Sequence, residues 1–589
     1  MLTNPHRLAL CAFGALLLSL GACRSARVEV THPAISVDDR VQLAADVILP
    51  IERPAVGVPT ILIQTRYWRS FRMRGGGGPK IPQGPRESIA ARLVQAGYAV
   101  VITDVRGTGA SDGVWRWPWS ADEVRDMGPT IDWIVAQPWS NGVVGATGVS
   151  YEGTTALLAA ASGRPALKAV LARQIEWQLA DETLAPGGVR NALFADTWAG
   201  AVNDLDHGRY PAMFPTIGKL LITGVGRRDD DPKGINQRER QDARPSSDIA
   251  QRARGVTRGS DLFGGDAPAT DSLGPAGHVP ALANTRTIVG IWGSWWDGAT
   301  ADAVFRAQEA ITISEARIGP WNHEGDQHAS PLKHATAERG TVDLDSVVAF
   351  FDRHLRAKPS LPDSSRRVHW YVAGAERWRS ASQWPRTTMR AWSLVSVGAM
   401  SGAMSGAPAG EDSLQRWRTT DRATTGKNNR WTTGLARPVD IIERGKARGI
   451  RSFQLPVLTD SLTVFGAGVF TCRMAADQPA ATLHVYVESI DPAGHVRLLT
   501  EGMQTITRNA ARGAPAGTSA SFSDTRALAD VSVRIRPVAF TLPTGWQIRV
   551  SLANEDAPTF ERVPQTGPVG WTIDTRSCAL TLPVETNGR

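Results

Sequence analysis

The chain has 589 residues, 42% of them hydrophobic and 21% charged, which is enough to bury a large core and to divide into two to four domains. A composition this apolar excludes an intrinsically disordered protein. The formal net charge is +8, but the basic residues are spread along the chain rather than gathered in one block, which argues against a nucleic-acid-binding protein.

Residues 1–22 have the pattern of an export signal. An apolar stretch over residues 8–20 is too short to span a bilayer permanently, and small residues follow it. The sequence Leu20-Gly21-Ala22-Cys23 resembles the bacterial lipobox, whose cysteine is lipidated and becomes the first residue after cleavage. We therefore expect a lipoprotein of the bacterial cell envelope, on its periplasmic or surface side, held to the membrane through Cys23 alone. A soluble secreted or periplasmic protein is the alternative.

The next part of the chain alternates strand-like and helix-like segments. Apolar runs typical of strands occur at residues 28–30, 41–49, 60–64, 98–103, 142–147 and 166–172. Helical spacing of apolar residues occurs between them, at 87–96 and 121–136. Parallel strands that alternate with helices predict an α/β domain with an open, doubly wound sheet.

This pattern is interrupted and then resumes. Residues 174–284 lack a regular period and predict a helical cap inserted into the sheet domain, above its site. Strand-like runs return at 286–292 and 316–318, and a strong helix is predicted over 342–355. The α/β domain is therefore expected to comprise residues 27–173 and 285–365.

Residues 366–589 are expected to form a separate all-β domain of jelly-roll type. Short strand-like runs punctuated by Gly and Pro occur here, at 368–372, 457–464, 481–487, 531–537 and 547–552. The domain also contains Cys472 and Cys578, which in an exported protein either form a disulfide or remain two buried thiols. The chain has no Cys-x-x-Cys or His-Glu-x-x-His motif, so we expect no metal and no cofactor.

The strongest chemical motif is Gly148-Val149-Ser150-Tyr151-Glu152-Gly153, which lies between a strand-like run and an alanine-rich helical run. Glycines two residues before and two after a serine permit a very tight turn from strand to helix, which leaves the hydroxyl exposed above the sheet. This arrangement is the nucleophile elbow of an α/β-hydrolase. Because a glycine-rich chain can contain the pattern by chance, the rest of the catalytic set must support it.

An α/β-hydrolase needs an acid and then a histidine later in the chain, each in a loop that follows a strand. Asp297 follows the strand-like run 286–292, and His323 follows the run 316–318. The order Ser150, Asp297, His323 matches the requirement. These three residues are therefore the predicted catalytic triad.

Four motifs together resemble the CocE/NonD hydrolases, the group that holds cocaine esterase, α-amino acid ester hydrolases and Xaa-Pro dipeptidyl-peptidases. They are Asp104-Val105-Arg106-Gly107, the elbow around Ser150, Trp296-Asp297-Gly298, and Gly319-Pro320-Trp321-Asn322-His323. The resemblance implies an α/β-hydrolase fold with a cap and a C-terminal jelly roll, and an oxyanion hole. One donor of that hole would be the backbone N–H of Tyr151 and the other the hydroxyl of Tyr67.

The substrate is less clearly indicated. Family members that accept a free α-amino group need a carboxylate near the pocket mouth, and Asp181 and Glu182 are candidates, although solvated acidic residues on a cap are common. Aromatic side chains could line the acyl pocket or simply pack in the core; the candidates are Trp177, Trp198, Trp295 and Trp296.

We expect a serine hydrolase that cleaves an ester or amide of an acyl or aminoacyl substrate through an acyl-enzyme. Activity of the α-amino acid ester hydrolase or cocaine esterase type is favoured, and Xaa-Pro dipeptidyl-peptidase activity is the alternative within the group. A non-catalytic lipoprotein that binds at the cell surface is the alternative from another class. The expected partner is a small ester, amide or short peptide, with no nucleic acid, and the enzyme could be a homo-oligomer.

Overall fold

The computed structural model describes residues 28–75, 85–214, 216–333, 338–339, 343–356, 366–394, 414–419, 423–435, 450–507 and 528–586. The predicted signal and Cys23 lie outside these ranges. Within them, no helix combines the length and the apolar character needed to cross a membrane.

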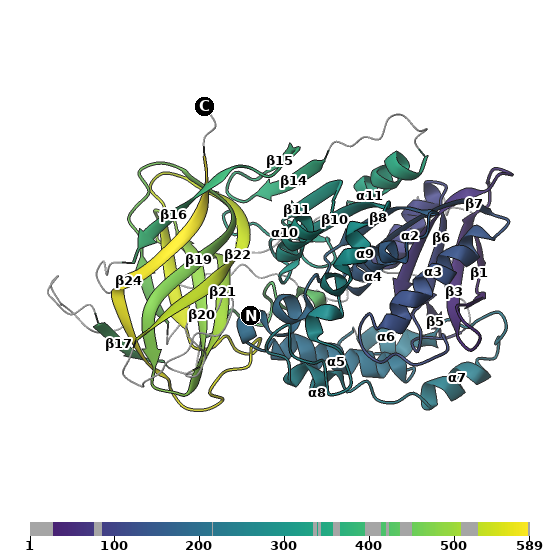
Figure 1. The fold of residues 1–589 in the computed structure, drawn as a ribbon, viewed down its shortest axis with the longest axis horizontal. Coiled ribbons are helices and arrows are strands. Elements are labelled where there is room, and N and C mark those ends of the chain that lie inside the picture. The colour runs from purple at the N-terminus through teal and green to yellow at the C-terminus, as the bar shows by residue number, and fades with distance from the viewer. Residues whose placement is uncertain are drawn as a thin grey trace, which may run out of the picture.

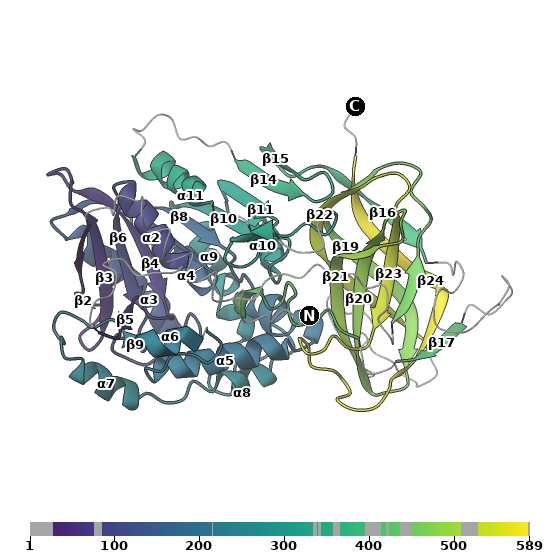
Figure 2. The ribbon, with the colours of Figure 1, turned by 180° about the vertical axis from the view of Figure 1, so that it is seen from behind.

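A mixed sheet forms the core of the first domain (Figures 1 and 2). Its strand order is β1-β3-β6-β4-β7-β8-β10-β11-β14-β15, with β2 paired to β3. The bounds are β1 Val28–Thr31, β2 Ala34–Ser36, β3 Gln42–Pro50, β4 Val58–Thr65, β6 Ala99–Asp104, β7 Ser140–Val149, β8 Leu167–Arg173, β10 Ile288–Ser294, β11 Glu315–Gly319, β14 Arg367–Val372 and β15 Arg377–Ala381. From β6 to β14 all neighbours are parallel, so their C-terminal ends lie along one edge.

Helices cover both faces of this sheet. Successive side chains of a strand point to opposite faces of its sheet. In β6, Val100 packs in the apolar cluster on one face and Val101 in the cluster on the other, so both faces need a cover. One face carries α2 (Pro85–Gln95) and α11 (Leu344–Phe351), and the other carries α3 (Ala121–Val135), α4 (Tyr151–Ala159) and α10 (Thr300–Ala310). The sheet is thus buried on both sides, as its near-continuous apolar strands require.

A long insertion separates β8 from β10, at the place where the sequence predicts the cap. It contains short helical turns η2 (Ala180–Leu184), η3 (Pro186–Gly188), η4 (Thr270–Ser272) and η5 (Pro275–His278), and the helices α5 (Ala192–Asp206), α6 (Thr216–Leu221), α7 (Ile235–Asp242), α8 (Ile249–Arg254) and α9 (Val279–Ala283). One strand of the insertion, β9 (Ile222–Val225), pairs with β5 (Phe71–Met73). Helix α5 lies toward the second domain in both views (Figures 1 and 2).

The second domain consists of two antiparallel sheets packed face to face. One has the order β16-β24-β19-β22 with β17 beside β24, and the other has the order β18-β23-β20-β21. The bounds are β16 Thr387–Ser393, β17 Leu414–Arg418, β18 Arg451–Gln454, β19 Leu462–Ala476, β20 Ala480–Ile490, β21 Val496–Thr507, β22 Ala529–Leu542, β23 Gln547–Ala553 and β24 Gly570–Glu585. Their inner faces share one apolar core.

The boundary between the domains differs from the one expected at residue 366. Residues 367–381 form β14 and β15, and β14 pairs in parallel with β11, from Glu315↔Arg367 to Ile318↔Trp370. The strand-like run at 368–372 therefore extends the first sheet instead of opening the β domain. Its alternating burial fits the last parallel position of a sheet as well as it fits a sandwich, so periodicity alone could not assign it.

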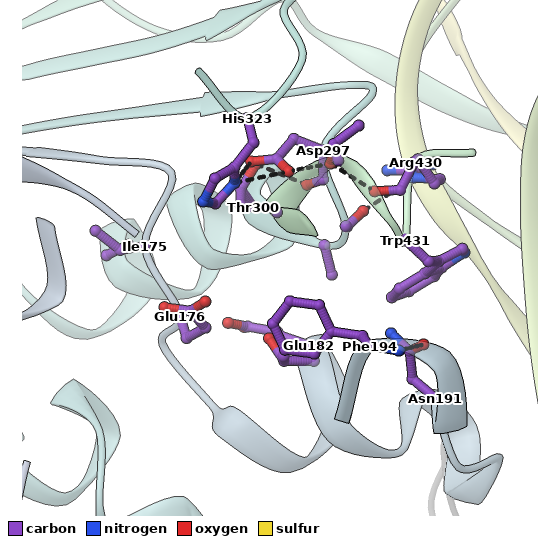
Figure 3. A pocket seen from close by; sticks show the side chains of 15 residues that line it. Ile175, Glu176, Glu182, Asn191, Phe194, Asp297, Thr300, His323, Arg430 and Trp431 are labelled. Atoms are coloured by element: carbon purple, nitrogen blue, oxygen red, sulfur yellow. Dashed lines mark hydrogen bonds and ion pairs between the residues drawn. The ribbon is translucent and has the colours of Figure 1, made fainter. Parts of the chain in front are cut away.

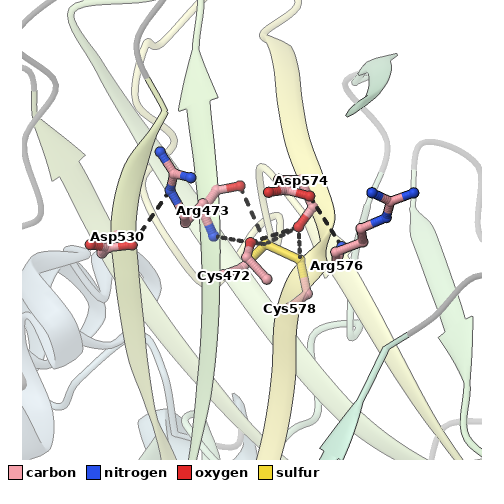
Figure 4. The surroundings of a disulfide bond; sticks show 7 residues. Cys472, Arg473, Asp530, Asp574, Arg576 and Cys578 are labelled. Atoms are coloured by element: carbon pink, nitrogen blue, oxygen red, sulfur yellow. Dashed lines mark hydrogen bonds and ion pairs between the residues drawn. A yellow bond between two sulfur atoms is a disulfide. The ribbon is translucent and has the colours of Figure 1, made fainter. Parts of the chain in front are cut away.

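Cys472 and Cys578 are joined by a disulfide between the neighbouring strands β19 and β24 (Figure 4). The bond closes a chain segment with a sequence separation of 106 residues. It decides between the two alternatives that the sequence left open for these cysteines.

Candidate active site

Ser150 occupies a sharp turn between β7 and α4. Its φ of 62° and ψ of −128° lie in a region that non-glycine residues rarely adopt. The flanking glycines are required by close contacts, since a Cβ on Gly148 would lie 2.4 Å from the backbone of Glu152, and one on Gly153 would lie 2.4 Å from the carbonyl oxygen of Arg173. The local structure is the strained strand-to-helix elbow that the sequence predicts.

Asp297 and His323 are in direct contact (Figure 3). They follow the adjacent parallel strands β10 and β11, and the Nδ1 atom of His323 lies 2.9 Å from both carboxylate oxygens of Asp297. Burial alone lowers the pKa of the imidazole, but the charge of Asp297 and this hydrogen bond outweigh it and raise the pKa to about 9. The pair can orient and stabilise an imidazolium.

Ser150 and His323 border two adjoining cavities. One cavity is lined by Ser150 and the other by His323 and Asp297, and the two share Glu176, Thr183 and Phe194. Among the described residues, neither the hydroxyl of Ser150 nor Nε2 of His323 has a hydrogen-bond partner. Ser150 therefore lies at the wall of one cavity and His323 at the wall of the other.

The predicted oxyanion donors lie in the Ser150 cavity. Tyr67 and Tyr151 both line it, with ring centroids 6.0 Å apart. The phenol of Tyr151 is 2.7 Å from the carboxylate oxygens of Glu123, so its side chain is committed elsewhere. Its backbone N–H is at the first position of α4, where a helix provides no acceptor. That N–H can bind an oxyanion, as can the Tyr67 hydroxyl, whose pKa burial keeps well above its usual value.

The acidic cap candidates are held by arginines. Asp181 forms ion pairs with Arg306 and with Arg536 of the β domain, at 3.2 Å for the latter. Glu182 lies 2.8 Å from Arg306 and accepts the backbone N–H of Trp177 at 2.6 Å. These contacts neutralise both carboxylates, so neither is available to a substrate ammonium, although Glu182 borders the His323 cavity.

The tryptophan candidates separate into two groups. Trp177, Trp295 and Trp296 are buried in the first domain's core and line neither the Ser150 cavity nor the His323 cavity. Trp295 donates its indole N–H to the carbonyl of Tyr371 at 2.9 Å, which is a packing role. Trp198 does line the Ser150 cavity, as do residues that the sequence analysis did not single out: Trp119, Leu179, Leu184, Phe194 and Phe263.

Glu176 is the most informative residue that sequence reasoning missed. It lies four residues beyond the predicted strand 166–172 and three beyond the observed end of β8 at Arg173. It borders both cavities, and Figure 3 shows it in the one that His323 lines. The Thr154 hydroxyl donates to it at 3.2 Å, and among the described residues it forms no ion pair with an arginine or lysine. Burial raises its pKa to about 7. A carboxylate in this position can bind a cationic group.

The second domain also reaches this site. Residues 423–435 bring Arg430, Trp431, Thr433 and Gly434 to the wall of the His323 cavity. No pattern in the sequence marked these residues, because the first-domain residues that Arg430 and Thr433 contact lie more than a hundred positions earlier in the chain. Within the described part of the chain, no group of three or more His, Cys, Asp or Glu residues could hold a metal ion.

Comparisons with known proteins find relatives of both domains. Residues 38–325 match the family described as "X-Pro dipeptidyl-peptidase (S15 family)", and residues 361–576 match "X-Pro dipeptidyl-peptidase C-terminal non-catalytic domain". A Mycobacterium bovis protein named "Putative serine esterase" is 28% identical over 580 residues, which is 91% of each chain. Cocaine esterase of a Rhodococcus species is 29% identical over 50% of this chain and 51% of its own.

A solved structure shows the same fold. An α-amino acid ester hydrolase superposes with a TM-score of 0.69 and 18% sequence identity, covering 96% of this chain and 98% of its own. At this identity the likeness establishes the arrangement of both domains and not the substrate.

Proposed function

Because the chain belongs to the CocE/NonD group of serine hydrolases, with an S15-type domain followed by its C-terminal β domain, we propose that Ser150, His323 and Asp297 are its catalytic triad and that it hydrolyses aminoacyl esters. The observation that carries the proposal is the buried Asp297–His323 pair beside the cavity of a serine held in an elbow. The non-catalytic alternative has no support among the relatives.

The residues provide each step of an acyl transfer. The Ser150 oxygen attacks the substrate carbonyl while Nε2 of His323 takes the hydroxyl proton, and Asp297 stabilises the resulting imidazolium. The backbone N–H of Tyr151 and the hydroxyl of Tyr67 donate to the oxyanion. His323 then protonates the departing alcohol, and a water deprotonated by His323 releases the acid and restores Ser150.

The lining of the cavities favours a substrate whose acyl group has an apolar side chain and a cationic group close to the reacting carbonyl. Trp119, Trp198 and Phe263 give the Ser150 cavity an aromatic wall. We assign the anchoring of an α-ammonium group to Glu176, in place of Asp181 and Glu182, because it faces the same cavity and has no arginine partner. An ammonium there would restore charge balance to a carboxylate that burial otherwise disfavours.

A substrate panel tests this function. We expect hydrolysis of p-nitrophenyl esters and faster hydrolysis of phenylalanine methyl ester, with covalent labelling of Ser150 by a fluorophosphonate and none in Ser150→Ala. The S15 match favours a second candidate, an Xaa-Pro dipeptidyl-peptidase, which would also need an ammonium site. A fluorogenic Xaa-Pro amide cleaved far faster than every ester would select that candidate.

We also propose that the enzyme is anchored in the cell envelope through lipid on Cys23. The proposal rests on the apolar stretch over 8–20 and the Leu20-Gly21-Ala22-Cys23 sequence. Cys23→Ser should move the protein from the membrane fraction to the soluble fraction, and unchanged membrane retention would contradict it. Sedimentation of the released protein would show whether it is a homo-oligomer.

A further inference from the structure

The β domain sends one loop, residues 423–435, against the catalytic pair of the other domain. Among the described residues, the carboxylate of Asp297 has two side-chain hydrogen-bond partners, His323 and Thr433. The Thr433 hydroxyl lies 2.5 Å from Oδ1 of Asp297, and both residues are almost fully buried, with 1% and 3% of their surface exposed. The contact crosses the domain boundary.

We infer that Thr433 is a positioning residue for the proposed reaction, and that the β domain therefore takes part in catalysis by fixing the orientation of Asp297. The inference rests on the proposed triad. Thr433 does not touch the reacting atoms; it acts on the carboxylate that orients His323.

The hydroxyl of Thr433 has one proton and two acceptors. Besides Asp297, the carbonyl oxygen of Arg430 lies 2.9 Å away. A carboxylate is the stronger acceptor because its hydrogen bonds are charge-assisted, so the proton belongs to the Asp297 contact. With His323 donating from one side and Thr433 from another, rotation of the carboxylate would break at least one of these bonds.

The backbone around Thr433 is tied to the backbone beside Asp297. The N–H of Gly298 donates to the carbonyl of Arg430 at 2.7 Å, and Nε of Arg430 donates to the carbonyl of Gly298 at 2.9 Å. This pair of bonds fixes the two chain segments against each other at the residue next to Asp297. Figure 3 shows Arg430 close to Asp297. The Thr433 hydroxyl is thereby held at a set distance.

The loop is also fixed to its own domain. The side-chain amide of Asn429 donates to Thr425 at 2.9 Å and to Thr559 at 2.8 Å, and the indole N–H of Trp431 donates to Glu501 at 2.6 Å. All five side chains are buried or nearly so. Buried hydrogen bonds thus connect the middle of the loop to β-domain residues as well as to the first domain, which suits precise placement of a hydroxyl.

Gly434 allows the loop to approach the histidine itself. A Cβ at this position would lie 3.2 Å from the ring of Phe194 and 3.7 Å from Cε1 of His323. The turn that supplies the hydroxyl therefore also lies beside the imidazole.

Thr433→Val tests the inference, because valine keeps the shape and removes the hydroxyl. Rates are measured on p-nitrophenyl acetate and divided by the concentration of sites that a fluorophosphonate titrates, so that loss of folded enzyme is not counted. We expect kcat to fall about tenfold, as for loss of one charge-assisted hydrogen bond, with KM changed by less than about twofold. Thr433→Ser, which restores the hydroxyl, should recover most of the rate.

The pH profile separates positioning from a merely structural role. The Thr433 hydrogen bond draws charge of Asp297 away from the imidazole, so its loss should raise the pKa of His323 and move the acid limb of kcat/KM to higher pH. The other groups that face His323, Glu176 and Glu324, are unchanged in the variant. Thr432→Val is the matched control, because the neighbouring buried hydroxyl of Thr432 contacts Lys427 and Asn429 and not Asp297. The acid limb of kcat/KM in this variant should stay where it is in the unchanged enzyme.

The outcomes are distinct. The inference would be overturned if Thr433→Val had the same normalised kcat and the same acid limb as the unchanged enzyme. It would also be overturned if Thr433→Ser lost as much kcat as Thr433→Val. If Thr433→Val fails to fold, Thr433→Ala with the same readouts replaces it. Full activity in Ser150→Ala would instead overturn the proposed function, whatever Thr433 does.

Discussion

The indole N–H of Trp198 donates to the phenol oxygen of Tyr67 at 2.8 Å. Because the oxygen accepts this bond, the Tyr67 proton has to point elsewhere, and no acceptor for it exists among the described residues. Tyr67 lines the Ser150 cavity, so the proton is available to an oxyanion formed there.

Tyr67→Phe should therefore lower kcat by about 10²–10³, the usual cost of one oxyanion donor. The ring and its packing remain, so the thermal midpoint should change little. Stopped-flow or steady-state rates on a p-nitrophenyl ester measure the effect. Trp198→Phe is the comparison variant: it keeps the phenol but removes the bond that orients it, together with part of the cavity wall, and it should lower kcat less than Tyr67→Phe. Equal rates for Tyr67→Phe and the unchanged enzyme would exclude the phenol as a donor.

The acid limb of activity should lie above the ordinary histidine value of 6.5, because the His323 pKa is raised to about 9. His323 accepts the Ser150 proton only when it is neutral, so activity is lost as the pH falls through that pKa. We expect kcat/KM for an uncharged ester to keep rising between pH 7 and 9. If kcat/KM were already constant from pH 7 upward, the pKa of His323 would not be raised by Asp297 to the expected value.

Glu176→Gln should act selectively on substrates with an ammonium group. The amide keeps the size of the side chain and removes its charge, so KM for phenylalanine methyl ester should rise about tenfold or more, while KM for a neutral acyl ester should hardly change. Burial raises the pKa of Glu176 to about 7, and an α-amino group loses its proton at about pH 7.7–8, so the preference for the amino ester should be largest between these values and fall on either side. An equal rise in KM for both esters would exclude Glu176 as the ammonium site and leave it a structural role.

The disulfide should stabilise the β domain without affecting chemistry. Joining Cys472 to Cys578 closes a long loop in the unfolded chain, for which about 2–5 kcal/mol of the free energy of unfolding is usual. Denaturant unfolding with and without reductant measures this difference. A Cys472→Ala, Cys578→Ala double variant should match the reduced protein and be insensitive to reductant. An unfolding midpoint that reduction leaves unchanged would refute the expectation.

The parts of the site that sequence analysis anticipated depend on short-range chemistry. The elbow around Ser150 is marked by a six-residue motif. The contact that demands Gly148 is local, with Glu152, whereas Gly153 is demanded by Arg173 at the end of the next strand. The direct contact of Asp297 with His323 likewise follows from two adjacent strand ends in the expected order.

What could not be anticipated depends on partners far along the chain. Asp181 and Glu182 look like free acids until Arg306 and Arg536 are placed beside them. Thr433 is one threonine among many until the fold brings it to Asp297. Glu176 did offer one usable indication, an acidic residue three positions after a buried parallel strand, at the sheet edge where the catalytic loops were expected.

The pairing of β14 with β11 has a practical consequence for dividing the protein. A catalytic fragment ended at residue 365 would leave the backbone of β11 as an open parallel edge and would uncover the apolar surface that Trp370 now shields. Such an edge invites association with other chains, so the fragment would be expected to aggregate. Any attempt to produce the two halves separately has to cut beyond Ala381, after the last strand of the sheet.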